Sequence, residues 1–190
     1  MRKIVIDPRV IKHLGRDLIT SSEVAVIELV KNSIDAKAKH INLRLYNGMP
    51  SSEVISAQVK NFIPEQYADL PMLIVEDDGG GMNDTTLDNG FLKIATDIKS
   101  SEEGTLGEKG IGRLATQRLG TALLVETSSE EERHTSYVFI DWNEVINGAE
   151  EVPSFEAPNT PCHTRLFIFN VNLEDYIDNA MQFEQLSLDT

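Results

Sequence analysis

The apolar residues near the N-terminus of this chain recur every three or four positions, which predicts two consecutive amphipathic helices. The first would begin at Asp7 and Pro8, since Asp is a good cap and Pro suits the first helical position. A Thr-Ser-Ser-Glu capping box at residues 20–23 would open the second helix, which we expect to run to about residue 37. The apolar positions of the first helix are Val10, Ile11, Leu14 and Leu18.

Farther along the chain the apolar residues alternate, which is the spacing of strands. Residues 40–46 place Ile41, Leu43 and Leu45 on one face of a predicted strand. Further strands are predicted over residues 72–75, 121–128, 135–142 and 163–170. Because most of these strands follow one another along the chain, we expect them to pair antiparallel.

The remaining segments complete an α+β fold. Residues 47–70 have mixed polarity and two prolines, so they are predicted to leave the sheet between two strands. Further helices are predicted over residues 84–93, 111–119 and 173–186. The expected architecture is a two-layer sandwich, a mixed and mostly antiparallel sheet with helices on one face. A length of 190 residues fits a single domain, residues 1–190.

Composition narrows the expected location and partners. No apolar run of about 18 residues occurs, so no membrane span is predicted. Cys162 is the single cysteine, which excludes an intrachain disulfide and favours the cytoplasm. The net charge of -14 argues against direct nucleic-acid binding by this domain, because phosphate contacts need clustered Lys and Arg.

The second predicted helix carries a polar stripe. Glu28, Asn32 and Asp35 stand at positions i, i+4 and i+7, so they share one side of the helix. Ala25 and Ala36 flank this stripe and leave room for a ligand to approach. A solvated helix face has the same pattern, so a functional interpretation requires a second site that converges on this one.

A glycine-rich segment directly after the strand at 72–75 offers such a site. Its sequence is Asp77-Asp78-Gly79-Gly80-Gly81-Met82. Glycines let the backbone turn sharply and pass close to a ligand, and Asp77 could accept a hydrogen bond from an exocyclic amine such as that of adenine. A tight Asp-Gly turn is the alternative, whereas the ligand spacing of a calcium loop is absent.

A third segment, residues 107–115, leads from glycines into a predicted helix. Free backbone N–H groups and the helix dipole favour an anion at such a place. The spacing Gly110-x-Gly112-x-x-Ala115 also matches a dinucleotide fingerprint, but residues 97–109 are too polar to be the buried strand that it requires. A P-loop sequence does not occur either.

Together, these three segments resemble the motifs of the GHKL ATPases, the superfamily named for gyrase, the heat-shock chaperone, histidine kinases and MutL. Residues 28–36 are similar to their N-box, residues 77–82 to the first glycine box and residues 107–112 to the second. Thr164 lies in a stretch similar to their late threonine strand, with His163 where a Gly is usual. The resemblance covers about residues 5–170.

The resemblance implies the Bergerat fold, with ATP bound between the helices and a lid at about residues 96–109. Asp77 would bind the adenine amine with support from Thr164, and Asn32 would bind the Mg²⁺ that bridges the phosphates. Gly110, Ile111 and Gly112 would offer backbone N–H groups to the phosphates. The further nucleotide contacts that it implies are Asp35, Ala36, Gly79, Gly81, Met82 and Gly107. Lys99 and Lys109 are candidates for neutralising phosphate charge, and a solvated lysine is the alternative for each.

Glu28 distinguishes the branches of the superfamily. A carboxylate one helical turn before the Mg²⁺ ligand can orient and deprotonate a water that attacks the γ-phosphate. The hydrolysing branches have Glu at this position, whereas histidine kinases typically have Asn. We therefore expect an ATPase. A histidine-kinase-type catalytic domain and a module that binds nucleotide without turnover are the alternatives.

The resemblance also implies the partners. ATP and ADP would be the ligands, and ATP-dependent closure would accompany homodimerisation in the full-length protein. We expect this chain to be the N-terminal part of a longer chaperone-like, MORC-like or MutL-like ATPase. Turnover by the isolated domain is expected to be slow.

Overall fold

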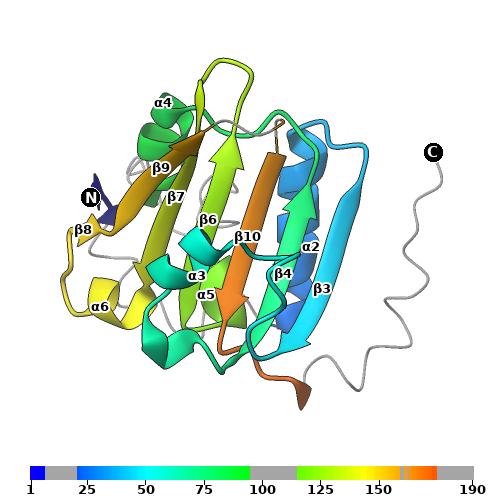
Figure 1. Ribbon diagram of the computed structural model, residues 1–190, viewed down its shortest axis with the longest axis vertical. Helices are drawn as coiled ribbons and strands as arrows, with labels where there is room; N and C mark the ends of the chain where they lie inside the picture. Colours follow the sequence, from blue (N-terminus) through cyan, green and yellow to red (C-terminus); the bar gives the residue numbers. More distant parts are fainter. Residues whose placement is uncertain (7–20, 95–114, 159–160, 162, 175–190) are drawn as a thin grey trace, which may run out of the picture.

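A six-stranded antiparallel sheet forms the centre of the structure (Figure 1). The structure is a computed structural model, and it describes residues 1–6, 21–94, 115–158, 161 and 163–174. The strands lie in the order β3-β4-β10-β6-β7-β9. Their bounds are β3 Ile41–Asn47, β4 Pro71–Asp77, β6 Ala122–Ser128, β7 His134–Asp141, β9 Ser154–Pro158 and β10 His163–Phe169. The late strand β10 therefore lies between β4 and β6, and its Thr164 pairs with Asp77 on one side and Thr127 on the other.

Helices α2 (Ser22–Asp35) and α5 (Ala115–Leu119) belong to the main core on one face of the sheet. Strands alternate, so every second residue of β4, β6, β7 and β10 points to this side. The buried residues from these strands are Leu73, Val75, Leu123, Val125, Val138, Ile140, Leu166 and Ile168. The α+β class with a mostly antiparallel sheet and helices on this face is confirmed.

The opposite face of the sheet has a second, smaller core. The segment at residues 47–70, predicted to leave the sheet between two strands, contains α3 (Ala57–Phe62) and the 3-10 turn η1 (Glu65–Tyr67). Figure 1 shows α3 on the side of the sheet away from α2. Ile55, Val59, Ile63 and Tyr67 pack there against Met72, Ile74, Ala122, Leu124, Tyr137, Phe139, Phe167 and Phe169. The inserted segment thus shields aromatic residues that would otherwise face solvent.

The start of α2 differs by one position from the sequence prediction. The helix begins at Ser22, and the hydroxyl of Ser21 accepts a hydrogen bond from the N–H of Val24 at 3.3 Å. Ser21 rather than Thr20 is therefore the cap. The helix ends at Asp35, and Lys37 has a φ of 62°, a left-handed conformation that closes the helix by turning the chain toward β3.

Several short elements had no counterpart in the sequence prediction. Strands of two residues are too short to show an alternating pattern, and a single helical turn shows no periodicity. The short elements are β1 (Arg2–Lys3) paired with β8 (Glu151–Val152), β2 (Val5–Ile6) paired with β5 (Lys93–Ile94), and α6 (Trp142–Ile146). The predicted helix at 84–93 appears as α4 (Asp84–Thr86) and the π-helical turn η2 (Leu87–Phe91).

Other predicted segments lie outside the described residues. These are the first helix, the final helix and the lid at 96–109, together with the first part of the helix predicted at 111–119. Among the helices that the structure does describe, none is long and apolar enough to cross a bilayer.

The loop after β4 lies directly against the end of β6. Gly81 has a φ of 64°, and a Cβ at this position would lie 1.8 Å from the carbonyl oxygen of Ser128. Glycine is therefore required here both for the left-handed backbone and for the close approach. By contrast, a Cβ on Gly80 would have its nearest neighbour, the carbonyl oxygen of Ala36, at 3.8 Å.

On the outer face of the sheet, beneath the inserted segment, Glu126 is 4% exposed and accepts hydrogen bonds from His163 and Arg165. Its Oε1 lies 2.7 Å from His163 Nε2, and its Oε2 accepts from Arg165 at 2.7 Å. Burial by itself would raise the pKa of Glu126 and lower that of His163. The hydrogen bonds and charges within this group outweigh burial, so the pKa of Glu126 is lowered and that of His163 is raised.

We predict that Gly81→Ala lowers the melting temperature by more than about 5 °C. A left-handed non-glycine residue costs roughly 1–2 kcal/mol, the steric overlap adds to it, and each kcal/mol shifts the melting temperature of a domain this size by about 2–4 °C. Differential scanning calorimetry would measure the shift. Gly80→Ala is the matched control and should change the melting temperature by less than half as much; equal shifts would contradict this account of Gly81.

We predict that His163 stabilises the fold most strongly on the acidic side of neutrality. Its pKa is raised in the folded state, so its contribution is complete below its ordinary pKa of 6.5 and is lost as the pH rises through the folded value. Urea unfolding should show wild type more stable than His163→Gln by about 1.5–3 kcal/mol near pH 6. This difference should shrink toward pH 9, and a difference independent of pH would contradict the assignment.

Candidate functional site

A cavity of about 200 Å³ opens on the helical side of the sheet, between α2, the ends of β4 and β10, and the α4–η2 segment. Its lining combines apolar side chains with a few polar groups, the usual composition of a small-molecule site. The residues that line it are Leu29, Asn32, Ser33, Ala36, Asp77, Gly81, Met82, Thr86, Gly90, Phe91, Thr116, Thr164 and Leu166.

Asp77, the last residue of β4, is the acidic group of this cavity and is only 7% exposed. Its Oδ2 accepts a hydrogen bond from the hydroxyl of Ser33 at 2.8 Å, and its Oδ1 accepts one from the backbone N–H of Gly79 at 3.0 Å. A carboxylate has about four acceptor positions. These two bonds therefore fix the orientation of the carboxylate and leave acceptor capacity for a ligand that donates.

Two threonines connect the glycine-rich loop to the sheet. The hydroxyl of Thr127 on β6 accepts a hydrogen bond from the backbone N–H of Met82 at 2.9 Å. It also lies 3.2 Å from the hydroxyl of Thr164 and 3.2 Å from the carbonyl oxygen of His163. The side chain of His163 points instead to the outer face, toward Glu126, so a large residue fits where the family motif usually has Gly.

Helix α2 contributes one wall of the cavity. Leu29, Asn32, Ser33 and Ala36 face it, at spacings of three and four residues, as expected for one side of a helix. Glu28 lies one turn before Asn32 and is not part of the wall; its side chain is 32% exposed, and its Oε1 accepts a hydrogen bond from Lys31 Nζ at 2.6 Å.

The end of α2 is held against the glycine-rich loop by backbone contacts. The N–H of Gly80 donates to the carbonyl oxygen of Ala36 at 2.9 Å. A Cβ on Gly79 would lie 2.9 Å from the Cβ and from the carbonyl oxygen of Ala36, so a larger residue would push the helix away. Gly79 therefore serves the close packing of helix and loop.

Asp78 organises the turn that connects α2 with β3. Its Oδ1 accepts hydrogen bonds from the backbone N–H groups of Lys39 at 2.7 Å and His40 at 2.8 Å, and its Oδ2 lies 2.7 Å from His40 Nδ1. The backbone and side-chain hydrogen bonds from His40 hold the pKa of Asp78 well below its usual range. Asp77 thus lines the cavity, whereas its neighbour Asp78 stabilises the turn.

The structure brings together some of the site residues predicted from the sequence. Asn32, Ala36, Asp77, Gly81, Met82 and Thr164 line one cavity. Glu28, Asp35 and Gly79 are described but do not line it. Lys99, Gly107, Lys109, Gly110, Ile111 and Gly112 lie outside the described residues. The individual roles of all these residues stay predictions.

Sequence reasoning missed several residues of the site. Ser33 adjoins Asn32 inside the N-box, and its position four residues after Leu29 was the available signal. Thr127 gave no signal, because its position beside Thr164 follows from the order of the strands. Thr86 and Phe91 belong to a segment whose helical pattern said nothing about which side would face a ligand.

The arrangement suits a flat, mostly apolar ring that carries a hydrogen-bond donor. Leu29, Met82, Phe91 and Leu166 provide apolar walls, and Asp77 provides the oriented acceptor. A volume of about 200 Å³ is below the roughly 300–1,000 Å³ of complete ligand pockets. The described walls therefore enclose one ring system, and the rest of a larger ligand would extend past Asn32 at the exposed edge of α2.

Comparison with solved structures shows a similar fold. The chain is similar to a structure titled as the crystal structure of the N-terminal domain of a DNA repair protein, with 18% sequence identity and a TM-score of 0.50. The match covers 93% of this chain and 44% of that chain, so this chain spans less than half of that relative's length. No curated protein matches the chain significantly.

Comparison with protein families gives a match over residues 19–164, to the family described as histidine kinase-, DNA gyrase B- and HSP90-like ATPases. This range includes the predicted N-box, both glycine boxes and Thr164. The match confirms the resemblance found in the motifs. Because it extends over most of the chain, this chain belongs to the histidine kinase-, DNA gyrase B- and HSP90-like ATPases.

Proposed function

We propose that this domain binds ATP with its adenine in the cavity and hydrolyses it. The observation that carries the proposal is the buried carboxylate of Asp77, oriented by Ser33 and the N–H of Gly79 at the base of an apolar cavity. Adenine is a flat ring with one exocyclic amine, so its amine would donate to Asp77 while Met82 and Phe91 contact its faces and edges.

Asn32 is the proposed protein ligand of Mg²⁺. Its side chain is exposed at the cavity edge, and its amide oxygen is a hard donor of the kind that Mg²⁺ prefers. Mg²⁺ usually takes only one or two protein ligands and completes its shell with phosphate oxygens and water, so a single Asn suffices. When bound, the ion would neutralise charge on the phosphates.

Glu28 is the proposed general base. It lies on α2 one turn before Asn32, on the solvent side, where a water attacking a terminal phosphate would arrive. Its ion pair with Lys31 spans three residues on an exposed helix surface, and such pairs contribute only about 0.3–0.5 kcal/mol. Glu28 can therefore leave Lys31 at little cost and turn toward the water.

We further propose that nucleotide binding is coupled to the lid at residues 96–109, and that Gly110, Ile111 and Gly112, which follow the lid in the sequence, would contact the phosphates. In the full-length protein this closure would favour a homodimer. In nucleotide switches of this kind, contacts with the triphosphate hold a segment in an ordered state, and hydrolysis releases it. Lid closure and dimerisation would depend on the nucleotide in the same manner.

We predict that Asp77→Asn weakens the binding of a non-hydrolysable ATP analogue at least about ten-fold. A hydrogen bond to a charged group is worth about 1.5–3 kcal/mol, and 1.4 kcal/mol corresponds to a factor of ten. Isothermal titration calorimetry with Mg²⁺ would measure the change.

Asp78→Asn is the matched control for this substitution. It removes one charge from Asp78, the neighbour of Asp77. Asp78 forms its hydrogen bonds with Lys39 and His40 and does not line the cavity. Its affinity for the analogue should equal that of wild type. An Asp77→Asn variant that binds as tightly as Asp78→Asn would overturn the adenine assignment.

We predict that Glu28→Gln lowers the rate of phosphate release about 10²–10⁴-fold, the usual contribution of a general base. Affinity for the ATP analogue should be unchanged, because Glu28 does not line the cavity. Glu23→Gln, in the first turn of the same helix, is the control and should retain the wild-type rate. Phosphate found on a protein histidine, or binding without any phosphate release by wild type, would argue against hydrolysis.

A further inference from the structure

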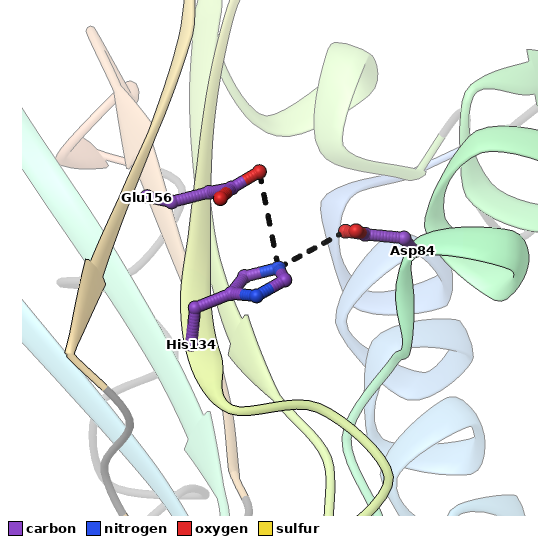
Figure 2. A group of neighbouring side chains, drawn as sticks. All are labelled: Asp84, His134 and Glu156. Carbon is purple, nitrogen blue, oxygen red and sulfur yellow. Dashed lines mark hydrogen bonds and ion pairs between the residues drawn. The ribbon is translucent and has the colours of Figure 1, made fainter.

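A second group of polar side chains lies outside the cavity, on the far side of the α4–η2 segment. Asp84 of α4, His134 at the start of β7 and Glu156 of β9 point toward one another, as Figure 2 shows. One ligand atom from each of the three lies within 4.8 Å of the other two. Three segments that are distant in the sequence thus converge on one point.

We propose that Asp84, His134 and Glu156 form a binding site for a divalent transition-metal ion of the Zn²⁺ class. The imidazole nitrogen favours Zn²⁺, Co²⁺ or Ni²⁺ over Mg²⁺ or Ca²⁺, which prefer all-oxygen sites. Three protein ligands with a fourth position open to water is the arrangement of many zinc sites.

The distances between the ligand atoms support this assignment. Two ligands that each lie about 2.1 Å from a tetrahedral ion are roughly 3.4 Å apart. His134 Nε2 lies 3.4 Å from Asp84 Oδ1 and 3.9 Å from Glu156 Oε1. His134 and Asp84 thus form a hydrogen bond that is longer than the roughly 2.7–2.9 Å of a charge-assisted one. Glu156 is 56% exposed, so its carboxylate can move the small distance that ligation requires.

The local charge also favours a bound cation. Among the described residues, Arg2 is the positive residue in contact with this group, and its guanidinium contacts Asp84 at 2.5 Å, Asp88 at 2.8 Å and Glu156 at 3.7 Å. One positive charge thus faces three carboxylates. With His134 neutral, this group carries a net charge of about -2, which a divalent ion would offset.

Arg2 contacts the same oxygens that the ion would use. Its Nη2 lies 2.5 Å from Asp84 Oδ1 and 3.7 Å from Glu156 Oε1, so a bound ion would displace this arm of the guanidinium from both carboxylates. Asp88 holds the second arm of the guanidinium in place at 2.8 Å. The hydroxyl of Ser136 lies 3.2 Å from Asp84 Oδ1 and orients that carboxylate.

The position of the site gives it a connection to the cavity. Asp84 and Asp88 face Arg2 on one side of the α4–η2 segment, whereas Thr86 and Gly90 line the cavity on the other. A bound ion would join β7 and β9 to the outer side of this cavity wall. The assignment of the metal site does not depend on ATP binding, since none of its three ligands lines the cavity.

The test is a titration of the complete chain, stripped with a chelator and free of nucleotide, with Zn²⁺ in a calorimeter and with Co²⁺ followed by visible absorption. Wild type should bind one ion, and the Co²⁺ form should give the intense bands of a tetrahedral site. His134→Gln should weaken Zn²⁺ binding at least ten-fold, since even loss of a residue that only supports a ligand typically costs 10- to 100-fold.

His40→Gln is the matched control, because His40 also contacts an aspartate but has no second carboxylate among its described partners. It should bind Zn²⁺ as wild type does. Glu156→Gln provides a second variant with an exposed side chain, so it should fold normally and also bind Zn²⁺ more weakly. No binding by folded wild type, or equal binding by wild type, His134→Gln and Glu156→Gln, would overturn the proposal and leave a group of ion pairs around Arg2.

Discussion

The insertion of β10 between β4 and β6 is the constraint on which the candidate site depends. Antiparallel pairing on both sides of β10 places Thr164 beside Asp77 and beside Thr127, three residues that are distant in the sequence. Backbone hydrogen bonds fix this register, and a slip by one residue would turn Thr164 to the outer face. The loop that carries Met82 is then held against the sheet by the hydroxyl of Thr127. The base of the cavity is therefore a property of the sheet order rather than of any single motif.

Side chains alternate along β10, so neighbouring residues of this strand face opposite sides of the sheet. Thr164 and Leu166 face the cavity, whereas His163 and Arg165 face the outer side and enclose Glu126. Arg165 donates to the carbonyl oxygen of Val54 as well, at 3.1 Å, so this ionic group connects the inserted segment to the sheet. Breaking a buried charge cluster by removing one partner is costly, because the remaining charge stays desolvated. The outer layer thus stabilises the strand that supports the cavity.

The α4–η2 segment lies between the cavity and the ion pairs around Arg2. Its inner side lines the cavity, and its outer side is held by Arg2 through Asp84 and Asp88. Arg2 itself belongs to β1, which pairs with β8 near the end of the sheet. This wall of the cavity is therefore positioned in part by ion pairs with β1.

The sequence by itself determined the family, the α+β class and the main strands, because alternating apolar residues and three glycine- or acid-rich motifs are local signals. It also indicated Asp77, Asn32 and Thr164 as candidate site residues, since each belongs to a motif with a fixed spacing. Only the tertiary structure decided that Ser33 and Thr127 orient the site, that residues 49–70 cover the outer face, and that Asp84, His134 and Glu156 meet. These features arise from contacts between segments far apart in the chain, and no local periodicity encodes which distant residues a strand order brings together.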